Sequence, residues 1–280
     1  MKIKNKIDFL NIILIPICGV LAYFFPLKVF ILSFCILGPL HYLTEINWLN
    51  ENRYFSALGK KKWLIVGLIT SFILIVPRLY FELIVEDESS SLTQLITNIN
   101  YWSNGAIFSC LLLAIASPFI KKKRDWLIIA LIAIASSYFL NEYESFTIII
   151  GVLVPTILHV YVFTLLFMLY GAKKNKSKTG YVSIVLAIIV PALFIIIPID
   201  PSNFLFDDYF KSALVDNHLH TTPVLFSKFL GLSDGTSFFF YEDLELRLMM
   251  FISFIYLYHY LNWFSKTTTI YWHKNLTKKR

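Results

Sequence analysis

Residues 38–49 read Gly38-Pro-Leu-His-Tyr-Leu-Thr-Glu-Ile-Asn-Trp-Leu49 and close an apolar run, 27–49, that is long enough to cross a membrane. His41 and Glu45 are four residues apart, so on an α-helix they lie on the same face, about one turn from each other. Ionisable side chains at the depth of the hydrocarbon core are unfavourable and are kept mainly where they have a function. The stretch therefore indicates a membrane-spanning helix, and the His41–Glu45 pair indicates a functional site within it.

The composition of the whole chain is that of a membrane protein. Of its 280 residues, 57% are hydrophobic and 15% are charged, whereas soluble domains are about half apolar and about a quarter charged. The net charge is +7, but the basic residues form short blocks between apolar runs. That placement is typical of membrane topology signals and of contacts with lipid headgroups, so we expect membrane lipids as partners and no nucleic acid.

The apolar runs predict the number of membrane-spanning helices. Crossing a hydrocarbon core of about 30 Å takes about 20 predominantly apolar residues. Runs of this kind predict an all-α, polytopic bundle of about eight transmembrane helices, which form a single transmembrane domain over residues 1–280. The predicted spans are 8–25, 27–49, 63–84, 101–120, 126–142, 145–170, 181–199 and 244–264. No small-residue cleavage site follows the first run, which predicts a retained helix rather than a signal peptide.

Charged residues alternate between the two ends of these spans. Basic blocks lie on one side, at 2–6, 53–62, 121–124, 173–178 and 266–280, and acidic segments lie on the other, at 86–88, 142–144 and 200–243. Because Lys and Arg gather in cytoplasmic loops, both termini should be cytoplasmic. The richness in Ile, Lys, Asn and Phe suggests an AT-rich bacterial genome, and hence a bacterial inner membrane. The segment 200–243 is rich in aromatic residues, which predicts one or two amphipathic helices on the outer face.

Three histidines fall at similar depths in different spans. His41, His159 and His259 lie about 14 or 15 residues from the outer ends of spans two, six and eight, or roughly 21 Å at a rise of 1.5 Å per residue. Glu45 lies one turn nearer to the cytoplasmic side. The shared depth predicts that the three imidazoles and this carboxylate meet inside the bundle.

Imidazole nitrogen and carboxylate oxygen are ligands of zinc, iron and copper. Two or three histidines with one carboxylate leave open positions on ferrous iron, and a bound cation would offset the unfavourable burial of Glu45. We therefore expect a divalent transition metal, iron before zinc, with His41, Glu45, His159 and His259 as ligands. Glu45 could instead orient one of the histidines, or reach the polar stretch at the inner interface that begins at Asn47. Glu45 and Asn262, which follows His259 by one turn, are the candidate catalytic residues.

Ligating histidines normally donate their second ring N–H to a nearby acceptor. The groups that the sequence places within one turn of a predicted ligand, or beside it, are Thr44, Thr156 and Asn262, and the tyrosines Tyr42, Tyr161, Tyr258 and Tyr260. The remaining histidines, His218, His220 and His273, are expected to lie outside the site. Cys18, Cys35 and Cys110 are embedded in apolar runs and predict no disulfide.

Two classes of function agree with these residues. The first is a membrane oxidoreductase or oxygenase that acts on a lipophilic substrate entering from the bilayer. The second is a proton-coupled transporter with His41 and Glu45 as a relay, or a protein that binds a b-type haem through two of the histidines. Polar packing between helices is the structural alternative. The chain has no His-Glu-x-x-His, no phosphate-binding glycine motif and no clustered histidine boxes, which disfavours intramembrane zinc proteases, nucleotide enzymes and desaturases.

Overall fold

A computed structural model describes residues 3–51, 60–84, 90–116, 119–120, 122–143, 146, 148–204, 209, 212, 215–216, 221–231, 234 and 243–270. All regular elements in these residues are helical, which confirms the all-α class. In chain order they are α1 (Ile3–Phe24), α2 (Pro26–Leu32), the π-helix η1 (Ser33–Leu37), α3 (Gly38–Glu51), α4 (Lys60–Leu83), α5 (Ser91–Tyr101), α6 (Ser103–Ala116), α7 (Lys123–Leu140), the π-helix η2 (Ile149–Val162), α9 (Phe163–Asn175), α10 (Lys178–Ile196), the 3-10 helix η3 (Pro201–Phe204), α12 (Thr221–Phe229) and α13 (Asp243–Ile270).

The chain divides into two compact units. The first unit combines Met1–Glu45 with Val152–Arg280, and the second unit comprises Ile46–Gly151. The single transmembrane domain that we expected over the whole chain stays a prediction. All three histidines in the membrane-spanning runs belong to the first unit.

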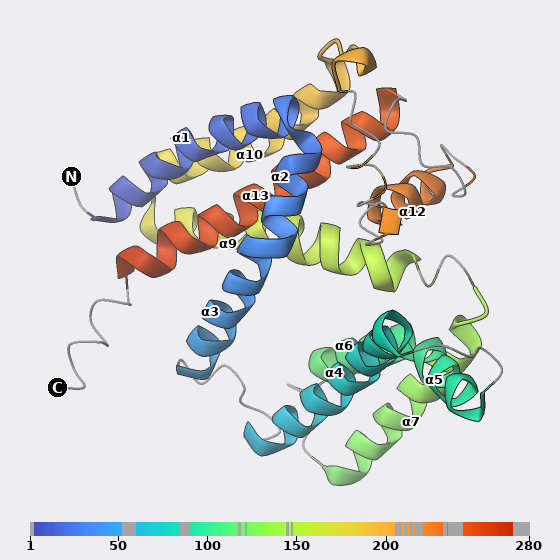
Figure 1. Ribbon diagram of the computed structural model, residues 1–280. Helices are drawn as coiled ribbons and strands as arrows, with labels where there is room; N and C mark the ends of the chain where they lie inside the picture. The colour runs from blue at the N-terminus through green and yellow to red at the C-terminus, as the bar shows by residue number, and fades with distance from the viewer. Residues whose placement is uncertain are drawn as a thin grey trace. The chain divides into compact units, whose positions relative to one another are not determined.

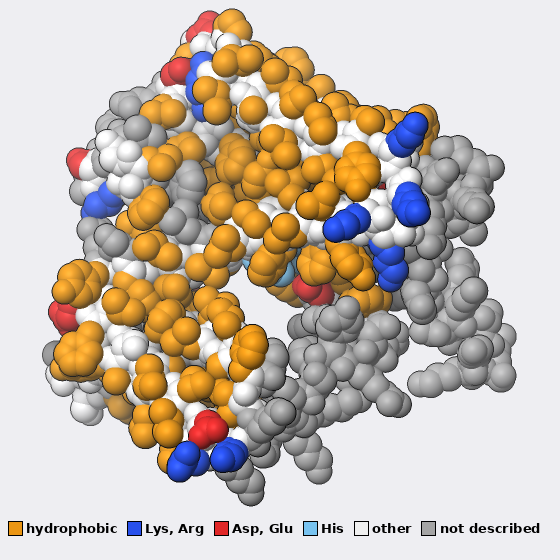
Figure 2. Space-filling model, turned by 180° about the vertical axis from the view of Figure 1, so that it is seen from behind, with side chains coloured by type: hydrophobic (Ala, Val, Ile, Leu, Met, Phe, Trp, Pro, Cys, Tyr) orange, Lys and Arg blue, Asp and Glu red, His pale blue; other side chains and the backbone are white. Residues whose placement is uncertain are grey.

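The distribution of buried and exposed side chains on helix α10 is typical of a helix that faces lipid. Its buried residues recur at every third or fourth position and are mostly small or polar, namely Gly180, Ser183, Ala187, Pro191 and Phe194. The residues between them are mostly apolar and exposed or partly exposed, such as Val185 at 53% and Ile188 at 49%. A helix of a soluble protein has the opposite arrangement, whereas small residues facing other helices are typical of membranes. Hydrophobic side chains also dominate the face of the protein seen in Figure 2.

Four helical segments of the described chain are long and apolar enough to cross a membrane. They are Ile7–Phe24, Pro26–Glu45, Val154–Asn175 and Lys178–Ile196, and they match predicted spans one, two, six and seven. These segments suggest an integral membrane protein. The other four spans, the bacterial inner membrane and the cytoplasmic position of both termini stay predictions.

Helix α13 is the central element of the first unit. Helices α1, α2 and α10 pack against it, as Figure 1 shows, and almost every side chain from Leu246 to Tyr260 is buried or partly buried. The hydroxyl of Ser253 donates to the backbone carbonyl of Pro26 over 2.5 Å. Hydrocarbon offers no hydrogen-bond partners, so such contacts fix how α13 sits against its neighbours.

Two of the three histidine-bearing segments contain wide π-helical turns. Helix η1 joins α2 to α3, which carries His41, and His159 lies within η2 itself. Pro39 and Pro155 lie in or just after these turns. Proline lacks a backbone N–H and disfavours regular α-helix, and π turns are frequent at functional sites. The unusual backbone therefore coincides with the candidate site.

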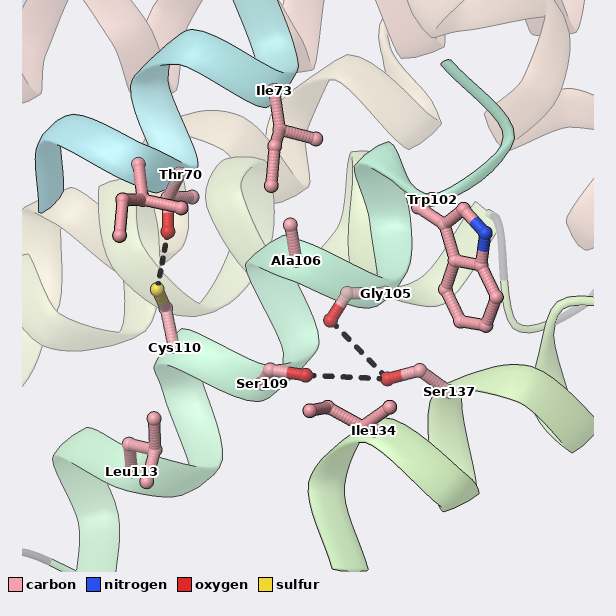
Figure 3. Close-up of a pocket in the computed structure, with 11 residues that line it drawn as sticks. Thr70, Ile73, Trp102, Gly105, Ala106, Ser109, Cys110, Leu113, Ile134 and Ser137 are labelled. Carbon is pink, nitrogen blue, oxygen red and sulfur yellow. Dashed lines mark hydrogen bonds between the residues drawn. The ribbon is translucent and has the colours of Figure 1, made fainter. Parts of the chain in front are cut away.

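The second unit packs α4, α5, α6 and α7 together. Helices α6 and α7 approach closely, because a Cβ atom on Gly105 would lie 2.9 Å from Cβ of Ser137. Residues of α4, α6 and α7 line an apolar cavity of about 350 Å³, shown in Figure 3. The polar side chains on its wall are already paired, Thr70 with Cys110 over 2.8 Å and Ser109 with Ser137 over 3.4 Å. None of the residues that line it is a histidine.

Helix α5 was not predicted from the sequence, and the predicted helices of 200–243 are described in part. Helix α5 lies in a stretch that we left between spans three and four; Ser90 caps it by accepting a hydrogen bond of 3.1 Å from the backbone N–H of Thr93. Within 200–243 the structure describes η3 and α12. Helix α12 contacts α13, while the amphipathic position on the outer face stays a prediction.

Arg247 of α13 closes the C-terminal end of α10. Its Nη1 lies 2.8 Å from the carbonyl oxygen of Ile195, 3.0 Å from that of Ile197 and also contacts that of Phe194. Its Nε donates to Asp243 over 2.9 Å. The last carbonyls of a helix lack partners within the helix and form its negative end, so a cation is favourable there.

We expect Arg247→Met to lower the free energy of unfolding by about 2 kcal/mol, because the carbonyl groups lose a charged donor. Thermal or denaturant unfolding in detergent micelles measures the change. Arg124→Met is the matched control, because the side chain of Arg124 is 78% exposed and its Nε lies 3.6 Å from Oδ1 of Asp125. Equal unfolding midpoints for the two variants would show that Arg247 does not hold α10.

Candidate metal centre

The structure brings the three predicted histidines together. His41 comes from α3, His159 from η2 and His259 from α13, and one ring nitrogen of each lies within 4.8 Å of the others. The ring centroids of His41 and His259 are 4.6 Å apart, and those of His159 and His259 are 5.4 Å apart. Segments separated by more than 200 residues thus meet at one point of the first unit.

His41 is the most enclosed of the three, with 1% of its surface exposed. Its Nε2 lies 3.1 Å from Nε2 of His259 and 3.2 Å from Oε2 of Glu45. The side chain of Glu45 is 24% exposed, so this carboxylate forms the accessible edge of the cluster. The spacing of four residues on α3 places His41 and Glu45 together, as the sequence predicts.

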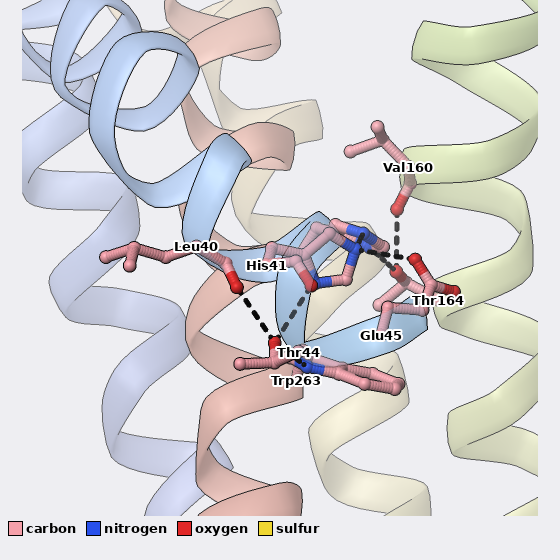
Figure 4. Close-up of polar contacts among 8 residues, drawn as sticks. Leu40, His41, Thr44, Glu45, Val160, Thr164 and Trp263 are labelled. Carbon is pink, nitrogen blue, oxygen red and sulfur yellow. Dashed lines mark hydrogen bonds and ion pairs between the residues drawn. The ribbon is translucent and has the colours of Figure 1, made fainter. Parts of the chain in front are cut away.

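The local sequence explains how α3 presents His41. Gly38 leaves room for Tyr260 of α13, whose hydroxyl oxygen would lie 3.1 Å from a Cβ atom at this position. Thr44 lies one turn after Leu40 and His41. Its hydroxyl is within hydrogen-bonding distance of the backbone carbonyls of His41, at 2.8 Å, and Leu40, at 3.0 Å. Trp263 donates from Nε1 to the same hydroxyl over 2.9 Å (Figure 4). This contact joins α3 and α13 one turn from His41.

Nδ1 of His259, the nitrogen that does not face His41, contacts a residue that was not predicted from the sequence. This nitrogen lies 2.6 Å from the hydroxyl of Thr164 on α9, and this hydroxyl lies 2.6 Å from the carbonyl oxygen of Val160. Thr164 lies on α9 and His259 on α13, so the two residues are 95 apart in the sequence. A search along each helix for partners one turn from a histidine therefore does not find it.

His159 has an open nitrogen. Its Nε2 is buried and has no hydrogen-bond partner among the described residues, and the same is true of Nδ1 of His41. The ring of Phe163 lies 6.3 Å from that of His159. Buried polar atoms are rarely left unpaired in proteins, so Nε2 of His159 indicates that something else completes the cluster. Nδ1 of His41 is a different atom from Nε2, through which His41 contacts His259 and Glu45.

The other predicted partners of the histidines lie elsewhere. The hydroxyl of Thr156 is 3.2 Å from that of Tyr256 and pairs with no histidine. Tyr161 donates to the carbonyl of Ala187, and Tyr258 donates to Asn11. These residues hold the bundle together.

Asn262 is not joined to the cluster by any hydrogen bond of the described residues, and its Oδ1 is buried without a partner. Its catalytic role therefore stays a prediction. Aromatic rings surround His41. The ring centroids of Tyr260, Trp263 and Tyr42 lie 5.1, 5.2 and 5.5 Å from the centroid of its imidazole. His218, His220 and His273 lie outside the residues that the structure describes.

The distances agree with the geometry of a metal ion. Four tetrahedral ligands at 2.0–2.1 Å from an ion lie about 3.3 Å from one another. The two distances from Nε2 of His41, 3.1 Å to His259 and 3.2 Å to Glu45, are close to this value. His159, within 4.8 Å, is near enough to complete the set after a modest movement of its side chain.

Comparisons with protein families, with curated proteins and with solved structures each find no match to this chain. A function for it rests on the residues of the site and their geometry.

We expect Glu45→Gln to weaken binding of a divalent transition metal by at least about tenfold, because the amide keeps the size of the side chain but loses its charge. Competition with a chromophoric chelator, on protein in detergent, measures the affinity. Glu142→Gln is the control, because this exposed carboxylate accepts a hydrogen bond of 2.7 Å from Tyr101 in the second unit. An unchanged affinity in Glu45→Gln would remove Glu45 from the ligand set.

Proposed function

We propose that this protein is an intramembrane metal-dependent oxidoreductase or oxygenase that acts on a lipophilic substrate. The observation that supports the proposal most directly is the approach of three buried or partly buried imidazoles and one carboxylate to a single point. In a chain with four apolar spans, such a group of polar side chains is rare unless it serves a function.

A transition metal explains this cluster better than polar packing does. Packing between helices pairs the polar atoms, as Thr156 and Tyr256 do, whereas Nε2 of His159 is buried without a partner among the described residues, although two other imidazoles are near. Three histidines and a carboxylate suit iron or zinc, and iron is the first expectation because such a set leaves positions open for substrate.

In this proposal, His41, His159 and His259 hold the ion, and Glu45 is either the fourth ligand or the group that orients His41. The bound metal would supply redox or Lewis-acid chemistry. Glu45 carries a negative charge that offsets the charge of the ion, and its exposed edge is the side on which a substrate can approach.

The surroundings of the site favour an apolar substrate. Side chains of α3 next to the cluster, Leu40 and Leu43, are 49% and 68% exposed, and Phe163 of α9 is 48% exposed. The rings of Tyr260 and Trp263 pack around His41. Ligand sites are mostly lined by hydrophobic and aromatic side chains with a few polar groups. We propose that the substrate reaches these residues from the bilayer, in which membrane lipids are the other partners, and that the membrane is a bacterial inner membrane with both chain termini in the cytoplasm.

A proton relay is the second candidate, and the 3.2 Å contact between His41 and Glu45 favours it. A histidine and a carboxylate in contact within a membrane can pass a proton between them. A haem held between His41 and His259 fits less well. Axial ligands bind on opposite faces of the macrocycle, and the two Nε2 atoms are only 3.1 Å apart.

Elemental analysis by mass spectrometry and an optical spectrum, on detergent-purified protein, test the proposal. We expect near-stoichiometric iron or zinc in the wild-type protein and its loss in His41→Ala/His259→Ala. His218→Ala/His220→Ala is the matched control, since it removes the same number of imidazoles from outside the predicted site. A Soret band would replace the proposal with a haem protein. Absence of metal from the wild-type protein, purified so that weakly bound ions are retained, would overturn it in favour of the relay.

His159→Ala tests the third histidine on its own. We expect this variant to lose the bound metal and to remain in the membrane fraction, because the substitution removes a ligand without changing the apolar length of its helix. Membrane fractionation followed by elemental analysis gives both results. Full metal content in the variant would exclude His159 from the site.

A further inference from the structure

Thr164 lies between two groups that constrain its single proton. Its hydroxyl oxygen is 2.6 Å from the carbonyl oxygen of Val160 and 2.6 Å from Nδ1 of His259. Thr164 is buried, with 4% of its surface exposed. Figure 4 shows the carbonyl group of Val160 directed at the hydroxyl of Thr164.

The carbonyl of Val160 can only accept a hydrogen bond, because it has no proton to give. Two oxygen atoms 2.6 Å apart repel each other unless a hydrogen lies between them. The proton of the Thr164 hydroxyl must therefore point at Val160. The hydroxyl then has only lone pairs left for His259, so Nδ1 of His259 is the donor in the second bond.

This arrangement determines which nitrogen of His259 is free. A neutral imidazole carries one proton, so a proton on Nδ1 leaves a lone pair on Nε2. That Nε2 faces the cluster, 3.1 Å from Nε2 of His41. Resting on the proposed function, we propose that Thr164 is a positioning residue, which holds His259 in the tautomer that presents Nε2 to the metal ion.

The same support is absent from His41 in the part of the chain that the structure describes. Its Nδ1 is buried without a partner, and its Nε2 is shared between His259 and Glu45. A hydrogen bond on the nitrogen that does not bind the metal sets both the tautomer and the orientation of a ligating ring. His259 has such a bond on Nδ1, so its Nε2 is already oriented to bind the ion. Thr164, and through it the backbone of η2, takes part in the site without touching the ion.

Three substitutions separate this role from simple packing. Thr164→Val keeps the shape of the side chain but removes the acceptor, and Thr164→Ser keeps the hydroxyl. Thr156→Val makes the same change eight residues earlier, at a buried hydroxyl whose hydrogen-bond partner is Tyr256. The affinity of each variant for Zn²⁺ is measured by chelator competition in detergent. The protonated nitrogen of His259 in the metal-free protein is identified by NMR with 15N-labelled histidine.

We expect Thr164→Val to bind Zn²⁺ about 10- to 100-fold more weakly, which is the usual effect of losing such a partner. Thr164→Ser should restore most of the affinity, and Thr156→Val should leave it unchanged. In the NMR spectra, the proton should lie on Nδ1 of His259 in the wild-type protein and in Thr164→Ser. It should lose this preference in Thr164→Val.

Wild-type affinity in Thr164→Val, or failure of Thr164→Ser to restore binding, would overturn the inference and leave the proposed metal centre intact. A wild-type protein that binds no metal would instead overturn the proposed function. In that case the NMR measurement still decides the hydrogen-bond part of the inference: a proton found on Nε2 in the wild-type protein contradicts it.

Discussion

A hydrogen-bonding atom surrounded by hydrocarbon must find its partner inside the protein, and the arrangement of α13 depends on this constraint. Ser253 joins α13 to the start of α2, Tyr258 joins it to Asn11 of α1, and His259 joins it to Thr164 of α9. Each contact links a different neighbour to the same central helix. The interactions that assemble the first unit therefore also place His259, and the site is not an addition to an independently packed bundle.

The histidine cluster stands out because it follows this constraint incompletely. The hydroxyls of Thr44 and Thr164 beside it are paired, whereas Nε2 of His159 is buried without a partner among the described residues. Leaving a buried polar group unpaired is unfavourable by about 1–3 kcal/mol. A fold that keeps such an atom within a group of three imidazoles has an arrangement that a ligand can stabilise. Glu45 at the accessible edge adds the negative charge that a cation requires.

Much of the fold could be predicted because membrane thickness limits helix length, and length is read directly from a sequence. The same linear measure placed His41, His159 and His259 at similar depths, and the structure brings them together. Contacts around the helix axis could not be predicted in this way. Thr156 is one turn from His159 yet pairs with Tyr256, whereas Thr164 reaches His259 on another helix. Helix α5 was missed because its polar residues give it no apolar run to detect.

The π-helical turn η1 separates two tasks within one membrane span. Each residue rotates an α-helix by about 100°, so an extra residue in a wide turn changes the direction of every side chain after it by about that angle. Phe30 of α2 precedes η1 and packs on Tyr256 of α13, while His41 follows η1. Side chains of α2 can thus be directed at the core while His41 of α3 is directed at the other two imidazoles. An insertion or deletion in α2, before Ser33–Leu37, therefore changes how α2 packs on the core. One between Leu37 and His41 changes the direction of the His41 side chain.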